Sequence, residues 1–278
     1  MKKLYDELAY KVSQATTEKY STSFSFGIKA LAPHLRDAIY AIYGFVRLAD
    51  EIVDSFHGYK QDELLQQLTI QTYQALEERI SLNPIIQSFQ ETVHRYQIDY
   101  SLIQLFLKSM RMDLSKLEYN DELYQEYILG SAEVVGLMCL HVFVEGDLDQ
   151  FKSLKPYAMK LGSAFQKINF LRDIKDDYHT LGRTYFPNVD MTTFDNETKA
   201  NIEQDIAQEF QEALIGIHRL PVSSRFGVFL AYKYYWLLFK KIKEMPAQRI
   251  LNARIRVPNT QKIMLMMGSY FDYQIARI

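Results

Sequence analysis

Glycine and proline, the residues that most often interrupt a helix, are scarce in this chain. There are 11 glycines and 7 prolines among 278 residues, together about half the share found in an average protein. Apolar residues recur at helical spacing over long stretches, and no convincing strand pair, fixed repeat or low-complexity run interrupts them. The sequence therefore predicts an all-α fold. A single domain spanning residues 1–278 is the economical arrangement, although this length also allows two domains.

Capping residues and periodicity place the predicted helices. Asn83 followed by Pro84 is typical of an N-cap and first-turn pair, and Pro33 can open another helix. The stretch 127–144 is very apolar but carries Glu133 near its middle, which favours a buried helix over a membrane span. The predicted helices cover 3–17, 33–56, 61–80, 84–97, 101–118, 121–145, 155–179, 196–218, 223–244 and 259–276, with ends expected within about two to four residues.

Charge and cysteine content exclude several classes of protein. Lysine and arginine number 32 against 34 aspartates and glutamates, which gives a formal net charge of -2, so a nucleic-acid partner is not expected. Cys139 is the single cysteine, which excludes an internal disulfide and a cysteine-rich zinc site. Asp6 and Glu7 fall where a signal peptide would need its apolar segment. A cytoplasmic protein is therefore expected.

Two of the predicted helices carry a line of polar residues beside an apolar stripe. Residues three and four positions apart share one face of a helix. The first line, at steps of four, three and four, consists of Tyr43, Arg47, Asp50 and Asp54. The second line, at steps of three, four and four, consists of Gln166, Asn169, Asp173 and Asp177.

Each line contains a pair of aspartates four residues apart. Like charges at this spacing destabilise an isolated helix by a few tenths of a kcal/mol, so a cation is expected between them. If the helices face each other, these carboxylates can hold Mg²⁺, with Mn²⁺ as an alternative, while water and diphosphate oxygens complete the coordination. Such a metal would assist the departure of diphosphate from carbon as a Lewis acid.

Ordinary surface ion pairs are the alternative explanation of these aspartates. Arg47 lies three residues before Asp50, and Arg172 lies four residues before Asp176, so each acidic group could be neutralised on its own helix. Spacing alone leaves the metal site and the surface ion pairs about equally supported.

Two further carboxylates interrupt apolar stripes. Asp113 projects from the apolar face of its predicted helix, so it is either a paired core residue or part of a site. Glu133 lies inside the most apolar stretch, where a structural ion pair or a position lining a cavity is favoured.

Hydroxyl, basic and aromatic residues supply further candidates. The segment 20–25 is rich in hydroxyls, which more often cap a helix than bind phosphate. Arg183, after Gly182, could reach a phosphate. Residues 240–262 contain seven basic residues and one acidic residue; a solvated face is the default, and a diphosphate or an anionic membrane are alternatives. Aromatic residues make up 14% of the chain and suit either a core or the wall of a tunnel for a carbocation.

Several motifs together resemble one family. The blocks Arg47-Leu-Ala-Asp50-Glu-Ile-Val-Asp54 and Asn169-Phe-Leu-Arg172-Asp173-Ile-Lys-Asp176-Asp177 resemble the paired signatures of the squalene and phytoene synthases. Further segments occur in the order expected of that family, namely 20–24, 130–136, 182–187 and 254–257. The likeness spans nearly the whole chain, and within the family the sequence is most similar to bacterial phytoene synthases.

The resemblance implies the all-α isoprenoid synthase fold, with helices surrounding a central cavity, and a head-to-head (1'-1) prenyltransferase. Two geranylgeranyl diphosphates would form phytoene and diphosphate through prephytoene diphosphate, in carotenoid biosynthesis, with Mg²⁺ and without NADPH. The alternatives are a squalene or dehydrosqualene synthase that uses two farnesyl diphosphates, and an inactive homologue that acts in assembly or lipid binding. Apolar substrates and products also imply peripheral contact with the inner face of the membrane.

The resemblance also assigns roles to individual residues. The implied metal ligands are Asp50, Asp54, Asp173 and Asp177. The residues implied to bind diphosphate or its metal shell are Arg47, Arg172, Ser21, Ser23, Gln166 and Asn169. Those implied to lie near the reacting carbons are Tyr43, Phe24 and Tyr185, and Asp113 matches a further acidic position of the family.

Three positions depart from the family pattern. Tyr20 stands where many relatives have histidine, Leu129 where many have tyrosine, and Glu133 where many have a small residue. These departures leave the acidic motifs intact, but they leave the shape of the cavity and the chain length of the product open.

Overall fold

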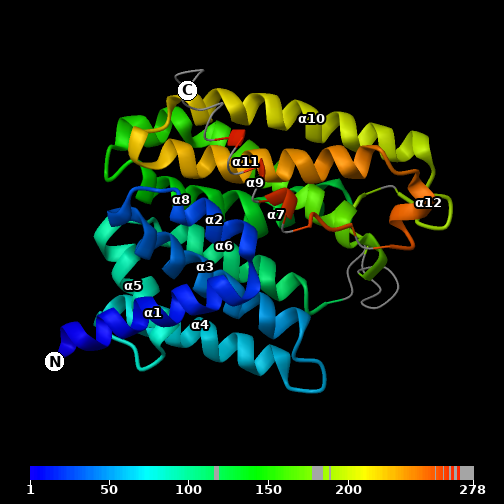
Figure 1. Ribbon diagram of the computed structural model, residues 1–278. Coiled ribbons are helices and arrows are strands. Elements are labelled where there is room, and N and C mark those ends of the chain that lie inside the picture. The colour runs from blue at the N-terminus through cyan, green and yellow to red at the C-terminus, as the bar shows by residue number, and fades with distance from the viewer. Residues whose placement is uncertain are drawn as a thin grey trace.

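The computed structural model describes residues 1–115, 119–176, 184–187, 189–253 and 255–258, together with 260–262, 264–265 and 268–269. Every regular element in this part of the chain is a helix, which confirms the predicted all-α class (Figure 1). In chain order the elements are α1 (Lys2–Tyr20), α2 (Thr22–Lys29), α3 (Pro33–Asp54), α4 (Gln61–Glu78), α5 (Pro84–Tyr96), α6 (Tyr100–Met112), α7 (Asp121–Ile128), the π-helix η1 (Leu129–Glu133), α8 (Val134–Phe143), α9 (Leu148–Asp176), α10 (Asn196–Arg219), α11 (Val222–Lys243) and α12 (Ala247–Ile250).

Capping explains the helix starts that the sequence predicted well. The side chain of Asn83 accepts a hydrogen bond from the backbone N–H of Ile85 at 3.0 Å, and Pro84 follows in the first turn of α5. Pro33 likewise occupies the first turn of α3. These starts depend only on residues that are neighbours in sequence, which is why the sequence alone located them.

Tertiary contacts explain where the observed helices differ from the predicted ones. The predicted helix 155–179 begins earlier, at Leu148, and contains Pro156 in its interior. It packs against α8, α10 and α11, so burial of its faces outweighs the local preference for a break at proline. Helix α2 was not predicted, because a helix of eight residues depends on packing rather than on periodicity. Most of the predicted helix 259–276 lies outside the described residues.

The predicted helix 121–145 is divided by the π-helix η1. Close packing surrounds this segment: a Cβ atom on Gly130 would lie 2.7 Å from the carbonyl oxygen of Leu105, and one on Gly162 would lie 2.7 Å from that of Ala132. Glycine therefore lets η1 approach both α6 and α9. Asp121–Phe143 is long and apolar enough to cross a membrane, but half of its most apolar window is buried inside the protein, as expected of a core helix.

Five helices form a closed ring of neighbours. Helix α2 packs against α3 and α11, α3 packs against α8, α8 packs against α9, and α9 packs against α11. Helix α10 lies beside α9 and α11 on one side of this ring, whereas α1 and α5 cover α3 on the other (Figure 1). The polar lines of α3 and α9 thus belong to two members of one ring.

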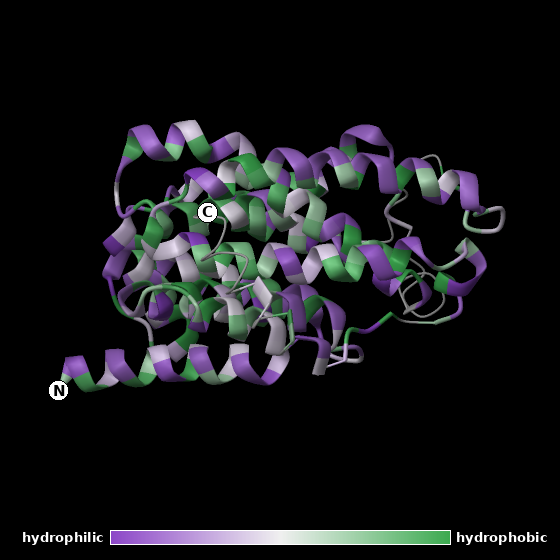
Figure 2. Cartoon of the chain, turned by 45° about the horizontal axis from the view of Figure 1, so that its top comes forward, coloured by the Kyte–Doolittle hydropathy of each residue, from purple (hydrophilic) through white to green (hydrophobic). Residues whose placement is uncertain are grey.

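The core continues from the ring into the outer helices. Phe45 of α3 stacks on Phe89 of α5 with ring centroids 3.9 Å apart, and Phe106 of α6 lies 5.7 Å from Phe45. Hydrophilic and hydrophobic residues alternate along the outer helix α1, whose ribbon begins at the N-terminus in Figure 2. This pattern is typical of a helix with one face on the core and one in water.

Candidate active site

The polar line of α3 occupies the last turns of that helix. Arg47 donates a hydrogen bond from Nη2 to Glu51, one turn further along. Among the described residues, the buried Nε of Arg47 has no hydrogen-bond partner. Arg47 thus pairs directly with Glu51, while its charge also acts on Asp50.

Carboxylates accumulate around Asp50. Loss of hydration raises the pKa of Asp50 to about 7, and the negative charges of Asp54 and Asp113 add to this rise. The positive charge of Arg47 opposes the rise but does not cancel it. Asp54, one turn further along, is exposed. This end of α3 therefore carries more negative charge than the neighbouring protein cations neutralise.

The polar line of α9 is held by hydrogen bonds within that helix. Arg172 donates from Nε to Asp173 Oδ1 at 3.0 Å, and from Nη2 to Asp173 Oδ2 at 2.5 Å. Asn169 donates to the side-chain oxygen of Gln166 at 3.4 Å. The side chain of Arg172 thus pairs with the adjacent aspartate, which positions a cation and a carboxylate side by side on this line.

Tyr43 links the polar lines of α3 and α9. Burial raises the pKa of Tyr43, whereas the neighbouring side chain of Ser21 lowers it. The charges of Arg47 and Arg172 lower the pKa of Tyr43 as well, so cations from both helices lie near one hydroxyl. Tyr235 of α11 donates a hydrogen bond to Asn169 at 3.3 Å and is close enough to Tyr43 to interact with it electrostatically. The two polar lines therefore face a common region.

The hydroxyl-rich segment before α2 forms a helix cap beside this region. Ser21 accepts a hydrogen bond from the backbone N–H of Phe24 at 3.2 Å, which agrees with the capping role favoured from the sequence. Ser23 lies partly buried in the first turn of α2. Ser21 thus serves both as a cap and as a neighbour of Tyr43.

An aromatic cluster adjoins the polar groups. Phe24 of α2 lies 5.6 Å from Tyr43 of α3 and 5.9 Å from Tyr235 of α11, measured between ring centroids. Phe165 of α9 stacks on Tyr235 at 3.8 Å. We call these residues, Phe24, Tyr43, Phe165 and Tyr235, the aromatic cluster; it joins four helices of the ring.

Asp113 and Tyr185 were predicted as site residues and prove to be partners of each other. Tyr127 donates a hydrogen bond to Asp113 Oδ2 at 2.8 Å, and Tyr185 donates to Oδ1 at 3.4 Å. The ring of Tyr185 stacks on Phe170 at 4.1 Å. Asp113 therefore combines the two alternatives left by the sequence, because it is a paired core residue that also contributes negative charge near Asp50.

Lys262 was not singled out by the sequence. Its Nζ donates to the hydroxyl of Thr22 at 2.8 Å and lies 5.4 Å from the centroid of the Tyr234 ring. Burial and the nearby positive charge of Arg172 lower its pKa. The sequence showed Lys262 only as one member of a basic stretch, and its partners are too distant along the chain for any spacing rule to identify them.

Two predicted residues lie outside the described part of the chain, namely Asp177 and Arg183. Among the described residues, no three histidines, cysteines, aspartates or glutamates lie close enough together to hold a metal ion. The assignment of Asp50, Asp54, Asp173 and Asp177 as metal ligands therefore stays a prediction.

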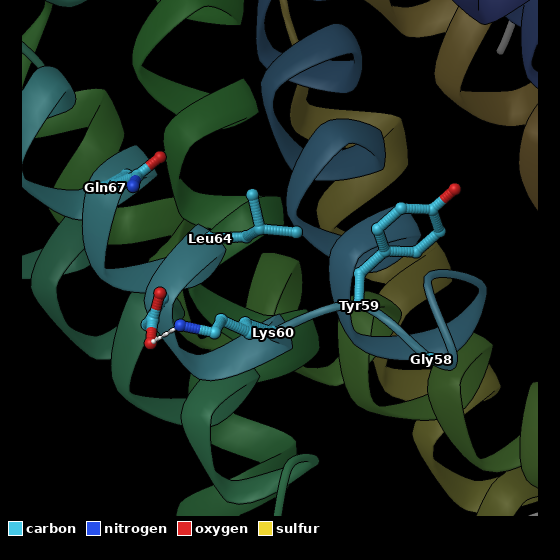
Figure 3. Close-up of a pocket in the computed structure, with 6 residues that line it drawn as sticks. Gly58, Tyr59, Lys60, Leu64 and Gln67 are labelled. Carbon is cyan, nitrogen blue, oxygen red and sulfur yellow. Dashed lines mark hydrogen bonds and ion pairs between the residues drawn. The ribbon is translucent and has the colours of Figure 1, made fainter.

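A pocket of about 340 Å³ lies elsewhere, at the start of α4 (Figure 3). Lys60 and Glu63 in its wall form an exposed ion pair at 2.8 Å. Its other lining residues are Gly58, Tyr59, Leu64 and Gln67. None of the predicted site residues contributes to this pocket, and its surface ion pair suggests no chemistry.

The chain is similar in sequence to known proteins. The sequence pattern of the family described as squalene/phytoene synthase matches residues 17–261. A phytoene synthase from Arthrospira platensis is 28% identical over 93% of this chain and 91% of its own length. A chloroplastic phytoene synthase from Narcissus pseudonarcissus is 31% identical over 66% of this chain and 44% of its own length.

Solved structures share the fold. The crystal structure of a dehydrosqualene synthase superimposes with a TM-score of 0.81 at 20% identity, over 97% of this chain and 98% of that one. The structure of a squalene synthase from Alicyclobacillus acidocaldarius gives a TM-score of 0.75 at 20% identity, over 87% of this chain and 95% of that one. The protein therefore has the all-α isoprenoid synthase fold and belongs to the squalene/phytoene synthase family, a family of prenyltransferase-type enzymes.

Proposed function

We propose that the protein joins two molecules of geranylgeranyl diphosphate head to head (1'-1) and forms phytoene through prephytoene diphosphate, as a step of carotenoid biosynthesis. The observation that carries this proposal is that the aromatic cluster joins the two polar lines: Phe24 lies 5.6 Å from Tyr43 on the line of α3 and 5.9 Å from Tyr235, which donates to Asn169 on the line of α9. Cations suited to a diphosphate thus lie next to π faces suited to an allylic cation. The similarity to a phytoene synthase over 93% of the chain supports the choice of product.

Carboxylate oxygens are the ligands that Mg²⁺ prefers, with Mn²⁺ as the alternative, and Mg²⁺ commonly takes only one or two of them and keeps water or phosphate oxygens as its other ligands. Asp50 has a pKa of about 7 because burial and neighbouring carboxylates disfavour its charge, and a hard divalent cation would relieve that repulsion. Asp50, Asp54 and Asp173, together with Asp177, would hold the metal. When bound, the metal neutralises charge on the diphosphate and so assists its departure.

Cations and polar groups of this chain would orient the diphosphate. The unpartnered Nε of Arg47 can donate to a phosphate oxygen, which would satisfy a buried donor. Arg172 would divide its donors between Asp173 and the diphosphate. The remaining residues proposed to bind the diphosphate or its metal shell are Ser21, Ser23, Gln166 and Asn169.

The aromatic cluster would act after the carbon–oxygen bond breaks. The faces of Phe24 and Tyr43 can stabilise the positive charge of an allylic cation, and these rings also exclude water that would capture the cation. Tyr185 is proposed to line the same region further along α9, where it stacks on Phe170.

A squalene or dehydrosqualene synthase that uses farnesyl diphosphate is the second candidate. The similarity to a dehydrosqualene synthase structure extends over 97% of this chain, and both reactions would use the same diphosphate groups. Incubation of the purified protein with each diphosphate, with and without NADPH, and identification of the hydrocarbon separates the candidates. A forty-carbon product formed without NADPH supports our proposal, whereas a thirty-carbon product and no turnover of the longer substrate would assign the alternative.

We also propose peripheral contact with the inner face of the membrane, because the substrates and product carry long apolar chains. Lys240, Lys241 and Lys243 lie in the last turn of α11 and supply positive charge for anionic headgroups. Sedimentation with phosphatidylglycerol vesicles tests this contact, with phosphatidylcholine vesicles as the control. Complete recovery in the supernatant with both kinds of vesicle would contradict it.

A further inference from the structure

Tyr20 lies at the edge of the proposed site, where it contacts Arg47. It is the last residue of α1 and directly precedes Ser21, the cap of α2. Its side chain is 50% exposed, yet its ring centroid lies 4.4 Å from the guanidinium carbon of Arg47. A guanidinium over an aromatic face at this distance forms a cation–π contact.

Arg47 contacts both Tyr20 and Glu51, and we call these three residues the triad. Arg47 donates to Glu51 on one side and lies under the ring of Tyr20 on the other. The side chains of Arg47 and Glu51 are only 26% and 19% exposed, whereas Tyr20 is largely open to water. The tyrosine therefore covers the outer face of the guanidinium.

The triad leaves a buried donor of Arg47, its Nε, without a partner among the described residues. Nη2 is bound to Glu51 and the face of the guanidinium is covered by the ring, but the buried Nε has no partner among the described residues. A buried donor without a partner is unfavourable unless a ligand completes it. The arrangement thus restrains a long side chain and keeps one N–H available.

We propose that Tyr20 is a positioning residue for Arg47: its ring supports the guanidinium, and Arg47 is thereby oriented before a diphosphate arrives. This inference rests on the proposed function in one respect, that Arg47 binds diphosphate. An arginine that is already ordered loses less side-chain entropy on binding its anion, so Tyr20 acts on diphosphate affinity through Arg47 without contacting the diphosphate itself.

The binding experiment uses the full chain, inorganic diphosphate with Mg²⁺ and isothermal titration calorimetry. Tyr20→Leu removes the ring, and Tyr20→Phe keeps it as the matched control. We expect Tyr20→Leu to raise the dissociation constant about two- to fivefold, the range of an exposed cation–π contact, and Tyr20→Phe to stay close to wild type. With geranylgeranyl diphosphate, the change should appear in KM rather than in kcat.

Arg47→Gln provides the test of coupling. If Tyr20 acts through Arg47, Tyr20→Leu should cause no further loss in the Arg47→Gln background. An equal loss in both backgrounds would overturn the inference, as would Tyr20→Phe binding as weakly as Tyr20→Leu, or Tyr20→Leu binding like the wild type.

A second readout separates this inference from the proposed function. The ring should shift the side-chain NMR signals of Arg47 in the wild type and in Tyr20→Phe, but not in Tyr20→Leu, with no ligand present. If these signals do not depend on the ring, the contact is absent and the inference fails whatever the enzyme does. If they do, but the wild type binds no diphosphate, the proposed function fails and the assigned purpose of the contact fails with it.

Discussion

Helix α9 carries two charged clusters on different faces, and they are built in opposite ways. Toward α10, Lys167 lies 2.5 Å from Asp205 and 3.0 Å from Glu209, and Ser163 donates to Glu209 as well. We call Lys160, Ser163, Lys167, Asp205 and Glu209 the α9–α10 network. The polar line of α9 instead faces a region in which burial, and after it the charges of neighbouring carboxylates, raise the pKa of Asp50.

The difference between the clusters indicates their separate uses. In the α9–α10 network each carboxylate has a lysine within 3.3 Å, so the charges neutralise each other and the network needs no ligand. At Asp50 like charges remain near one another, an arrangement that costs stability and is retained where a ligand supplies the missing charge. Loss of charge should therefore affect stability in the first region and activity in the second.

The largest effect is expected for Asp50→Asn. Removing a metal ligand should lower kcat roughly 10³-fold, while stability should rise by about 1 kcal/mol because a buried charge is removed and the carboxylates near Asp50 no longer repel it. Product analysis and urea unfolding measure the two quantities. Asp173→Asn and chelation with EDTA should likewise abolish turnover while the helical circular dichroism stays unchanged. Near-native turnover of either variant would remove the metal assignment.

Lys167→Met should have the converse effect on stability. The lysine side chain is 7% exposed and the side chain of Glu209 is 5% exposed, so the variant leaves a carboxylate buried with only Lys160 and Ser163 as partners. We expect a loss of about 3 kcal/mol in the free energy of unfolding, measured by urea denaturation. The exposed Lys152 provides the control, since Lys152→Met should change stability by less than about 0.5 kcal/mol. Equal stability of the two variants would show that the network does not hold α9 to α10.

Glu133 predicts how the stability of the protein depends on pH. Burial, together with the charge of Glu209, raises the pKa of Glu133 from 4.5 to about 7. The folded state therefore binds more protons than the unfolded state between these values, and stability falls as the pH rises from 4.5 to 7. Glu133→Gln should remove this fall, which we expect to be about 1 to 2 kcal/mol after allowance for solvent screening. Urea midpoints at pH 4.5 and 8 measure it, and identical pH dependence in the variant and wild type would contradict the placement of Glu133 beside the α9–α10 network.

Local signals account for what the sequence predicted of the fold. The cap at Asn83 and the polar line of α3 depend on residues within one or two turns, so spacing rules identified them. The arrangement of the helices around a central cavity was implied by the family resemblance, since no spacing rule places α3 relative to α9. The early start of α9 depends on burial against other helices, which propensity does not contain.

Long-range pairing accounts for what the sequence missed. Lys167 and Glu209 are 42 positions apart on two amphipathic helices, and in sequence they resemble ordinary solvated charges. Tyr20 and Arg47 are similarly remote, and the sequence noted the tyrosine as part of the hydroxyl-rich segment and as a departure from the family pattern, but not as a partner of Arg47. Tertiary contacts therefore distinguish the α9–α10 network, in which the charges are neutralised, from the carboxylates around Asp50, in which they are not. For this reason the sequence could propose the site but could not assign the partners within it.

The smallest effects are expected at the partners of Asp113. Asp113 is hydrogen-bonded, whereas the carboxylates of the α9–α10 network are neutralised by lysines. Its carboxylate has hydroxyl partners rather than a lysine, and the bond from Tyr127 is shorter, at 2.8 Å, than the bond from Tyr185, at 3.4 Å. Tyr127→Phe should therefore cost about 1 kcal/mol of stability, and Tyr185→Phe less, because each variant keeps its ring and loses only a hydrogen bond. Thermal unfolding with parallel turnover measurements checks this order. If Tyr185→Phe instead lowered kcat with no change in stability, the hydroxyl of Tyr185 would act on the substrate. Asp113 would then be part of the site around Asp50 rather than a residue of the core.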